Sequence, residues 1–326
     1  MSNLMTNGHS PQTSPPKWRG FVYYLRSQVR KSPYLLNIEF TKLCNAKCFF
    51  CHCWQLESNN ELQDYGPVVK KFRPVVASIS GGEPLLRKNY AELLAGIRPW
   101  CHFLMIITNG SLLTEESAAK LRGAGVDQIT ISLDYLSKQH DEVRKIDGLF
   151  EHISKMAPLL VSKGYKICFN SIIMESNLDH IIPLAEQSLQ WGCSISYSSF
   201  CTLKANETSE MVDHQKIEKL KTIVTKLKEL KRKHHHIKNS TFYLDRIVPY
   251  FQKGGIEGCK AGHTFIQITP DGYVQRCAEL PRMAHYTQYW PTQVERTPCT
   301  KCWYGCRGET EGNFLAPDKL RGLLRA

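Results

Sequence analysis

Three cysteines near the start of the chain have the spacing of a metal-binding loop. Cys44, Cys48 and Cys51 form a C-x3-C-x2-C motif. Thiolates select zinc and iron–sulfur clusters among biological metals. Three thiolates fill three iron sites of a cubane cluster and leave the fourth iron open to a small ligand, whereas structural zinc usually has four protein ligands. The motif therefore favours an iron–sulfur site, with a zinc site completed by His52 or Cys53 as the alternative.

A second group of cysteines lies in the last quarter of the chain. The chain has 13 cysteines, and structural disulfides are disfavoured in the cytoplasm. Five of them follow residue 258 at spacings that suit another metal site: Cys259, Cys277, Cys299, Cys302 and Cys306. The scattered ones (Cys53, Cys101, Cys168, Cys193 and Cys201) are predicted to be buried as small apolar side chains, in most cases.

The composition indicates a globular protein of 326 residues, with 42% apolar and 22% charged residues. The sequence contains no run of about 18–20 apolar residues, which a membrane-spanning helix needs. The N-terminus lacks the basic region and apolar core of a secretory signal. We therefore expect a cytoplasmic protein.

The formal net charge of +12 favours an anionic partner, such as a nucleic acid, an acidic membrane surface or an anionic substrate. Much of the excess lies in residues 216–233, where apolar residues recur at helical spacing and lysines occupy the other face. A solvated amphipathic helix explains this segment better than a binding surface, and no nucleic-acid partner is favoured.

The elements that must position the cysteines alternate between strands and helices. Strands are expected at 36–42, 75–80, 103–109, 128–134, 166–174 and 194–200, and helices at 61–71, 88–98, 114–124, 139–161, 178–191 and 210–233. Six such units predict an α/β fold with a parallel sheet covered by helices, and several strands are continuous apolar runs, as in sheets buried on both faces. The first cysteine motif follows the first strand, where active-site loops of such folds lie.

The predicted organisation has three parts. Residues 1–33 form a flexible leader with a short helix, residues 34–240 the α/β core, and residues 241–326 a small cysteine-rich domain. The last part is rich in Gly, Pro and Cys, with short extended segments at 265–269 and 273–277 around a turn at Pro270-Asp271-Gly272. We expect metal to stabilise this domain in place of a large core.

The first cysteine motif, with Phe50 before its last cysteine, is similar to the signature of the radical S-adenosylmethionine (SAM) superfamily. Further motifs that resemble those of the superfamily follow at the strand ends: Gly81-Gly82-Glu83-Pro84, Thr108-Asn109-Gly110 and Ser132-Leu133-Asp134. The resemblance covers about residues 35–200. It implies a partial (β/α)6 TIM-like barrel in which Cys44, Cys48 and Cys51 hold a [4Fe–4S] cluster that cleaves S-adenosylmethionine to a 5′-deoxyadenosyl radical.

The resemblance also implies roles for the residues at the strand ends. Gly81, Gly82, Glu83 and Pro84 would contact the methionine amino group, since glycines permit close approach and Glu83 offers a carboxylate to an ammonium. Polar side chains of the next motifs would bind the rest of the cofactor: Thr108, Asn109, Ser132 and Asp134. Arg144 would pair with the cofactor carboxylate, and Asn170 and Asn177 would shape the pocket.

The second cysteine group resembles the SPASM and twitch extensions of the same superfamily, which carry auxiliary [4Fe–4S] clusters. The full SPASM pattern has seven cysteines and two clusters, so the five here predict one auxiliary cluster. We expect Cys259, Cys277, Cys299 and Cys302 to be its ligands and Cys306 to be a substitute or a bystander. A zinc ribbon is the alternative, because four thiolates also suit zinc. Glu279 is a speculative catalytic base.

The resemblance therefore implies an enzyme that receives an electron from a flavodoxin- or ferredoxin-type donor and removes hydrogen from a substrate. We expect a small-molecule substrate and a dehydrogenation, an epimerisation or formation of a C–C or C–S bond. The first 33 residues leave no room for the leader-binding domain that many peptide-modifying relatives carry. Maturation of a ribosomally made peptide is the alternative; RNA modification and a non-catalytic iron–sulfur protein are less favoured.

Overall fold

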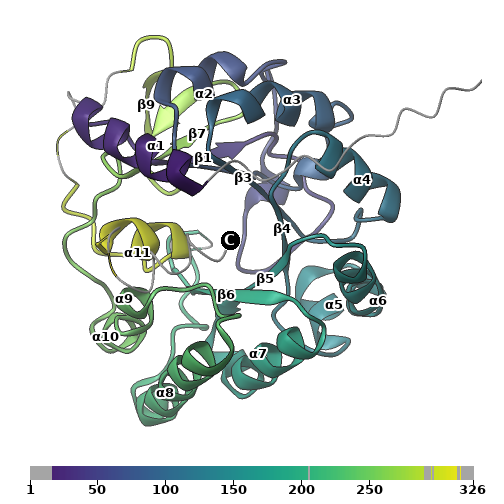
Figure 1. Cartoon of the computed structure of the whole chain (residues 1–326). Helices are drawn as coiled ribbons and strands as arrows, with labels where there is room; N and C mark the ends of the chain where they lie inside the picture. The colour runs from purple at the N-terminus through teal and green to yellow at the C-terminus, as the bar shows by residue number, and fades with distance from the viewer. Residues whose placement is uncertain (1–16, 205, 290–294, 296, 314–315, 317–326) are drawn as a thin grey trace, which may run out of the picture.

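The computed structural model describes residues 17–204, 206–289, 295, 297–313 and 316. These residues form a single nine-stranded sheet in the order β6-β5-β4-β3-β2-β1-β7-β8-β9. The six core strands are parallel and follow one another along the chain: β1 Leu35–Glu39, β2 Val76–Ser80, β3 Phe103–Thr108, β4 Gln128–Ser132, β5 Ile167–Ile173 and β6 Ser194–Ser199. The predicted open, TIM-like arrangement of six parallel strands is thereby confirmed (Figure 1).

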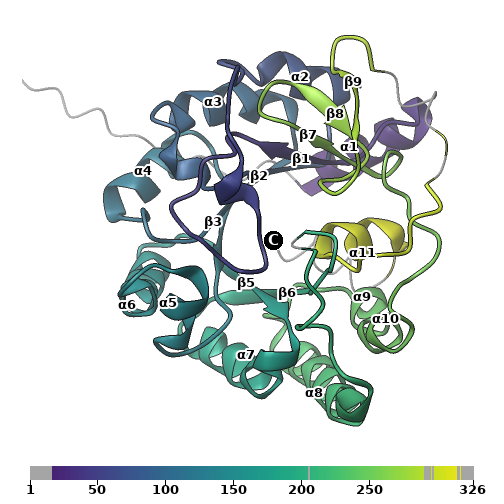
Figure 2. The same ribbon diagram turned by 180° about the vertical axis from the view of Figure 1, so that it is seen from behind.

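The strands of the cysteine-rich region continue this sheet. Strand β7 (Phe265–Ile268) pairs in parallel with β1, and β8 (Tyr273–Gln275) and β9 (Arg282–His285) add to it as antiparallel strands. The region after residue 240 thus shares the sheet of the core. Seen from behind, β7 lies next to β1, and β8 and β9 extend the sheet beyond β7 (Figure 2).

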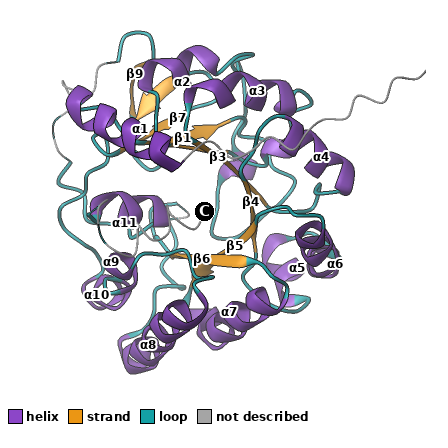
Figure 3. Cartoon of the chain, viewed as in Figure 1, coloured by secondary structure: helices purple, strands orange, loops and turns teal. Residues whose placement is uncertain are grey.

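Helices surround the outer face of the sheet (Figure 3). Their bounds are α1 Lys17–Arg30, α2 Gly66–Phe72, α3 Tyr90–Ile97, α4 Glu115–Gly123, α5 Gln139–Arg144, α6 Leu149–Ser162, α7 Ile181–Gln190, α8 Ile217–His234, α9 Thr241–Leu244, α10 Ile247–Lys253 and α11 Gly305–Glu311. Among the described residues, no helix is both long enough and apolar enough to cross a bilayer.

Three predicted helices differ in the structure, and the one expected at 61–71 begins only at Gly66. The single helix expected at 139–161 is divided into α5 and α6, because Lys145 (φ 57°) and Gly148 (φ 71°) adopt left-handed backbone conformations that interrupt a right-handed helix. The helix expected at 210–233 begins only at Ile217, after a short 3-10 turn that the Asp213 side chain caps.

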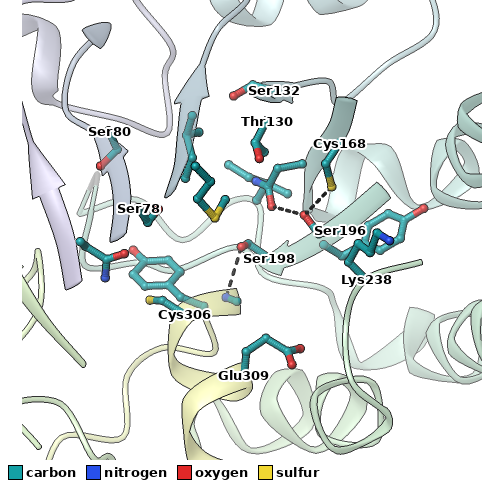
Figure 4. Close-up of a pocket in the computed structure, with 18 of the residues that line it drawn as sticks. Ser78, Ser80, Thr130, Ser132, Cys168, Ser196, Ser198, Lys238, Cys306 and Glu309 are labelled. Carbon is teal, nitrogen blue, oxygen red and sulfur yellow. Dashed lines mark hydrogen bonds between the residues drawn. The ribbon is translucent and has the colours of Figure 1, made fainter. Parts of the chain in front are cut away.

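The two faces of the core strands have different chemistry. In β2, Ala77 and Ile79 are fully buried in the apolar layer between the sheet and the helices, whereas Ser78 and Ser80 line the interior of the barrel. The same alternation places Thr130 of β4 and Ser196 of β6 inside (Figure 4). These three strands are therefore not continuous apolar runs. Their inner faces are polar because they border a cavity in place of a packed core.

Helix α11 closes the open side of the barrel, between β6 and the β1–β7 pair (Figure 1). The backbone N–H of Gly305 donates to Ser198 Oγ of β6 at 3.3 Å. At the other end of the helix, Tyr34 Oη, just before β1, donates to the carbonyl of Thr310 at 2.5 Å. Gly308 packs so closely on Tyr243 that a Cβ there would overlap the ring. This helix brings C-terminal residues into the wall of the barrel.

Candidate functional site

The first cysteine motif forms a loop over one end of the barrel. The loop begins after Glu39, the last residue of β1. A hydrogen bond from Cys51 N–H to the Cys48 carbonyl (3.2 Å) closes the turn between the last two cysteines. Cys44, Cys48 and Cys51 all line one cavity of about 1650 Å³ that occupies the barrel. Ala46 and Phe50 of this loop are buried in an apolar cluster. Its other buried members are Tyr135, Met174 and Phe200. Three thiols therefore reach the same cavity from one loop.

The glycines after β2 hold this loop against the sheet. Gly82 N–H donates to the Thr41 carbonyl and Glu83 N–H to the Leu43 carbonyl, both at 2.8 Å. A Cβ at Gly82 would overlap the backbone of Leu43, and a Cβ at Gly81 (φ 138°) would overlap the Thr41 carbonyl. Both positions therefore require glycine, because only the absence of a side chain lets the two segments come this close.

Glu83 links the ends of β2 and β3. Its fully buried carboxylate accepts from Asn109 N–H at 2.7 Å, Thr108 Oγ1 at 2.8 Å and Leu85 N–H at 3.1 Å. Burial raises the pKa of Glu83 to about 7, against the lowering effect of these hydrogen bonds. Among the described residues, the cavity lining includes Gly81 and Gly82 but neither Glu83 nor Pro84. Glu83 is therefore engaged within the protein, and its predicted contact with the cofactor stays a prediction.

The turn after β3 gives the cysteine loop a second attachment. Asn109 Nδ2 donates to Asn45 Oδ1 at 2.9 Å, and Asn45 Nδ2 donates to Ser111 Oγ at 2.8 Å. Asn45 stands between Cys44 and Cys48. Thr108 and Asn109 also line the cavity beside the loop. The two motifs after β2 and β3 thus converge on the loop, as their positions in the sequence predict.

Asp134 and Arg144 form a buried ion pair beneath Cys48. Arg144 Nη2 lies 2.6 Å from Asp134 Oδ2, and the other carboxylate oxygen accepts from Ile172 N–H at 2.9 Å. Arg144 Nη1 lies 4.0 Å from Cys48 Sγ, and its Nε has no hydrogen-bond partner. Asp134 is therefore engaged within the protein, whereas Arg144 lines the cavity and faces the cysteine loop. Their predicted cofactor contacts stay predictions.

Short polar side chains of β2, β4, β5 and β6 line the barrel interior (Figure 4), whereas β3 contributes the apolar Met105 and Ile107. Ser132, the last residue of β4, and Asn170 of β5 are among these polar side chains, as predicted for pocket residues. Asn170 Oδ1 accepts from Ser196 Oγ at 3.2 Å. Asn177 lies elsewhere: it is fully buried, and its side chain donates to the Ile172 carbonyl at 2.7 Å. In closed TIM barrels these inner positions hold bulky branched residues, so the short side chains here account for the open cavity.

The second cysteine group is only partly brought together. Cys259, Cys277 and Cys306 pack against one apolar cluster that contains Tyr34 and Phe265. Cys306 also lines the barrel cavity, which the sequence did not predict for a possible bystander. None of the 13 cysteines forms a disulfide. Among the residues that the structure describes, no three His, Cys, Asp or Glu side chains converge as they would around one metal ion.

Arg307 holds the last cysteine loop in place from the interior. Its side chain is completely buried and donates to the carbonyls of Cys302 (2.8 Å), Ile256 (2.7 Å) and Glu257 (3.1 Å). Its Nε also pairs with Glu311 at 2.8 Å within α11. The guanidinium thus joins the segment before Cys259 to the segment around Cys302.

Most of the residues that line the cavity between the two cysteine groups were not predicted from the sequence. Glu279, Tyr304, Cys201 and Lys204 line the cavity between the two cysteine groups. Tyr304 Oη donates to Glu279 Oε1 at 2.8 Å, and Cys201 Sγ donates to the Lys301 carbonyl at 3.5 Å. The negative charge of a Cys51 thiolate raises the pKa of Lys204. Of this set, the sequence analysis gave a role only to Glu279, as a speculative base. The position of Cys201 and Lys204 just after β6 was an available signal for the others.

A family model for the radical SAM superfamily matches residues 38–187. Among curated proteins, an AdoMet-dependent heme synthase of Methanosarcina barkeri is 28% identical over 322 residues, which cover 90% of this chain and 88% of the relative. A probable GTP 3′,8-cyclase of Methanocaldococcus jannaschii is 27% identical over 263 residues, covering 74% of this chain and 84% of the relative.

Solved structures share the fold. Streptococcus suis SuiB bound to its precursor peptide SuiA superposes with a TM-score of 0.66 at 16% identity, covering 84% of this chain and 68% of SuiB. The enzyme anSMEcpe with bound AdoMet gives a TM-score of 0.60 at 15% identity, covering 89% of this chain and 82% of that chain.

The buried His140 beneath Asp134 predicts acid lability. Its Nδ1 accepts from Asp134 N–H at 3.3 Å, and burial, reinforced by Arg144, lowers its pKa to about 3. The unfolded chain protonates this ring near pH 6.5, so the stabilisation is complete above that pH and is lost as the pH falls toward 3. The free energy of unfolding should fall by about 1.4 kcal/mol per pH unit on this account.

A His140→Gln variant keeps an acceptor for Asp134 N–H but does not titrate. Urea unfolding should therefore show the difference in stability between wild type and variant shrinking as the pH falls from about 6 to 4. His214→Gln, at an exposed position, is the matched control. A difference that stays constant over this range would contradict the assignment.

Proposed function

Because the chain belongs to the radical SAM superfamily, we propose that Cys44, Cys48 and Cys51 hold a [4Fe–4S] cluster whose open iron binds S-adenosylmethionine. Once bound, this cofactor supplies the 5′-deoxyadenosyl radical that takes a hydrogen atom from the substrate. The enzyme would act on a polar small molecule held in the barrel, with a flavodoxin- or ferredoxin-type donor supplying the electron. The observation that carries this proposal is the single cavity that all three thiols share with the strand-end motifs.

The residues around the loop suit such a cluster. The three thiols come from one loop. Burial raises the pKa of Cys48, and Arg144, with Nη1 4.0 Å from Cys48 Sγ, would favour the thiolate form against that effect. Cys44 Sγ accepts a hydrogen bond from Ala46 N–H at 3.4 Å. Gly81 and Gly82 present backbone without side chains to the cavity, which leaves room for the methionine part of the cofactor.

The lining of the barrel supports a polar substrate. Hydroxyl and amide groups from β2, β4, β5 and β6 face the cavity, and they can orient a substrate through hydrogen bonds on several sides. Cys306 and Glu309 of α11 form the remaining wall.

The names and titles of the relatives point to substrates of different size. The curated relatives that match most of this chain are named for haem and for GTP, which are both small molecules. The solved structures include SuiB with its precursor peptide and anSMEcpe with a peptide, so peptide maturation is the second candidate. The similarity to the haem synthase over 90% of this chain favours the small molecule.

For the second cysteine group, we propose an auxiliary [4Fe–4S] cluster in a C-terminal domain of residues 241–326. The packing of Cys259, Cys277 and Cys306 on one apolar cluster supports these three as ligands. The fourth ligand would come from Cys299 or Cys302, which belong to the same loop. Compared with the ligand set expected from the sequence, this proposal gives Cys306 a ligand role, because α11 carries it to the side of Cys259 and Cys277.

Formation of 5′-deoxyadenosine tests the proposed activity. Anaerobically reconstituted protein should bind about eight irons per chain and, with dithionite and S-adenosylmethionine, release 5′-deoxyadenosine. The Cys44/Cys48/Cys51→Ala triple variant should keep about half of the iron and release none. A wild-type protein that forms no 5′-deoxyadenosine with dithionite or with reduced flavodoxin would contradict the proposal.

The class of substrate can be read from the same product. Extracts of cells grown in deuterated medium should transfer deuterium to 5′-deoxyadenosine when they contain the substrate. A small-molecule substrate predicts that this transfer survives protease treatment and removal of everything above about 1 kDa. Loss of the label after protease treatment would instead establish the peptide alternative.

Iron content tests the role of Cys306. Cys306→Ala and Cys277→Ala should each lower the iron content of the Cys44/Cys48/Cys51→Ala background from about four irons per chain toward zero. Cys201→Ala is the matched control, because this buried cysteine borders the same region without packing on the cluster of Cys259. Full iron retention in Cys306→Ala would show that it is a bystander.

A further inference from the structure

Helix α1 has an exposed apolar stripe. Trp18, Val22, Leu25 and Val29 follow one another at intervals of four, three and four residues, which places them in one row along the helix. Their exposed fractions are 66%, 48%, 46% and 84%, and Phe21 beside them is 46% exposed. Large apolar side chains are usually exposed singly, so a continuous row on one helix indicates a contact surface.

The opposite face of α1 packs on the barrel. Gly20 fits against the His102 ring just before β3, and the ring of Tyr24 contacts that of Tyr34 just before β1, at 5.7 Å between centroids. Ser27 is buried, and its Oγ donates to the Tyr24 carbonyl at 2.7 Å. The helix is thus anchored beside the N-terminal ends of the strands (Figure 1), and the exposed fractions of its apolar stripe show that this face is not covered by the barrel.

A row of arginines runs beside the stripe. Arg19, Arg26 and Arg30 are spaced by seven and four residues, and residues 17–30 contain no Asp or Glu. None of the three forms an ion pair with any acid that the structure describes, and Arg26 Nε is buried without a hydrogen-bond partner. Burial and the neighbouring charges of Arg30 and Arg73 lower the pKa of Arg26. The positive charge of α1 is therefore not balanced by an acid on the same helix.

Further positive charge lies at the same end of the barrel. The last turn of α8 contains Lys231, Arg232 and Lys233, and the chain then runs alongside the start of β6, where Lys238 N–H donates to the Ile195 carbonyl at 2.8 Å. The barrel cavity extends to this end, since its lining includes His102, Lys238 and residues of α8. The basic segment that the sequence left without a role thus borders the end of the barrel that α1 covers.

We propose that α1 lies in the interface of an anionic lipid membrane and seats the N-terminal end of the barrel on that surface. An apolar stripe containing Trp and Phe, flanked by arginines and free of acids, suits the boundary between acyl chains and anionic headgroups. The long arginine side chains can reach the headgroups while the stripe enters the apolar layer. The basic end of α8 adds attraction to the same surface. This inference does not depend on the chemistry proposed for the cysteine loop.

Vesicle sedimentation tests the proposal with the full chain. The protein should sediment with vesicles of phosphatidylcholine and phosphatidylglycerol but not with phosphatidylcholine alone, and high salt should weaken the binding. Val22/Leu25/Val29→Gln preserves helix propensity and removes the stripe, so binding should fall at least about tenfold. Arg19/Arg26/Arg30→Gln should lower it about a hundredfold.

A matched control removes one exposed lysine from α4, one from α6 and the lysine directly after α6: Lys120/Lys155/Lys163→Gln. It changes the net charge equally, so it should bind vesicles like the wild type. Equal loss in this control, or wild-type binding in both α1 variants, would overturn the proposal. A wild-type dimer that the Val22/Leu25/Val29→Gln variant converts to a monomer, without vesicle binding, would assign the stripe to a second copy of the chain instead.

Discussion

Two backbone hydrogen bonds between the end of β2 and the cysteine loop are the constraint on which the rest of the site depends. Gly82 and Glu83 donate to the carbonyls of Thr41 and Leu43, directly before Cys44. Their geometry allows no side chain at Gly81 or Gly82. Because Glu83 also binds Thr108 and the backbone of Asn109, one short turn joins the loop to two strands. The cysteines are thus positioned by rigid elements although they lie on a loop.

The cavity follows from a second constraint, the short polar side chains on the inner face of the sheet. With serine, threonine and asparagine where closed barrels have branched residues, the interior stays open from the cysteine loop to the N-terminal ends of the strands. The sheet itself does not close, and α11 fills the gap. That helix carries Cys306 into the cavity wall, so both cysteine groups border one space.

The sequence predicted the parts of this arrangement that depend on local pattern. The alternation of strands and helices, and the position of motifs at strand ends, follow from short-range periodicity and were correct for all six core strands. The inner polar face was also visible, since Ser78 and Ser80, or Ser196 and Ser198, alternate with apolar residues. Strand β3 and parts of β5 are continuous apolar runs and do not show this alternation.

Long-range packing could not be predicted in the same way. The pairing of Asp134 with Arg144, the seating of Cys306 next to Cys259 and the entry of Lys204 into the cavity each join segments that no local pattern connects. The break between α5 and α6 depends on Lys145 in a left-handed conformation, which is rare for lysine and has no sequence signal of its own. The exposure of the apolar stripe of α1 could not be predicted, because the sequence does not show which face of the helix packs on the barrel.

The most direct test of the central claim is the iron content of Gly82→Ala. The added methyl group would overlap the Leu43 backbone and displace the loop before Cys44. The account predicts that the variant stays folded, loses about half of its iron after anaerobic reconstitution and forms no 5′-deoxyadenosine. Gly123→Ala, where a Cβ meets nothing within 4 Å, should keep the full iron content and form 5′-deoxyadenosine like the wild type. Full iron content and wild-type 5′-deoxyadenosine formation in Gly82→Ala would contradict it.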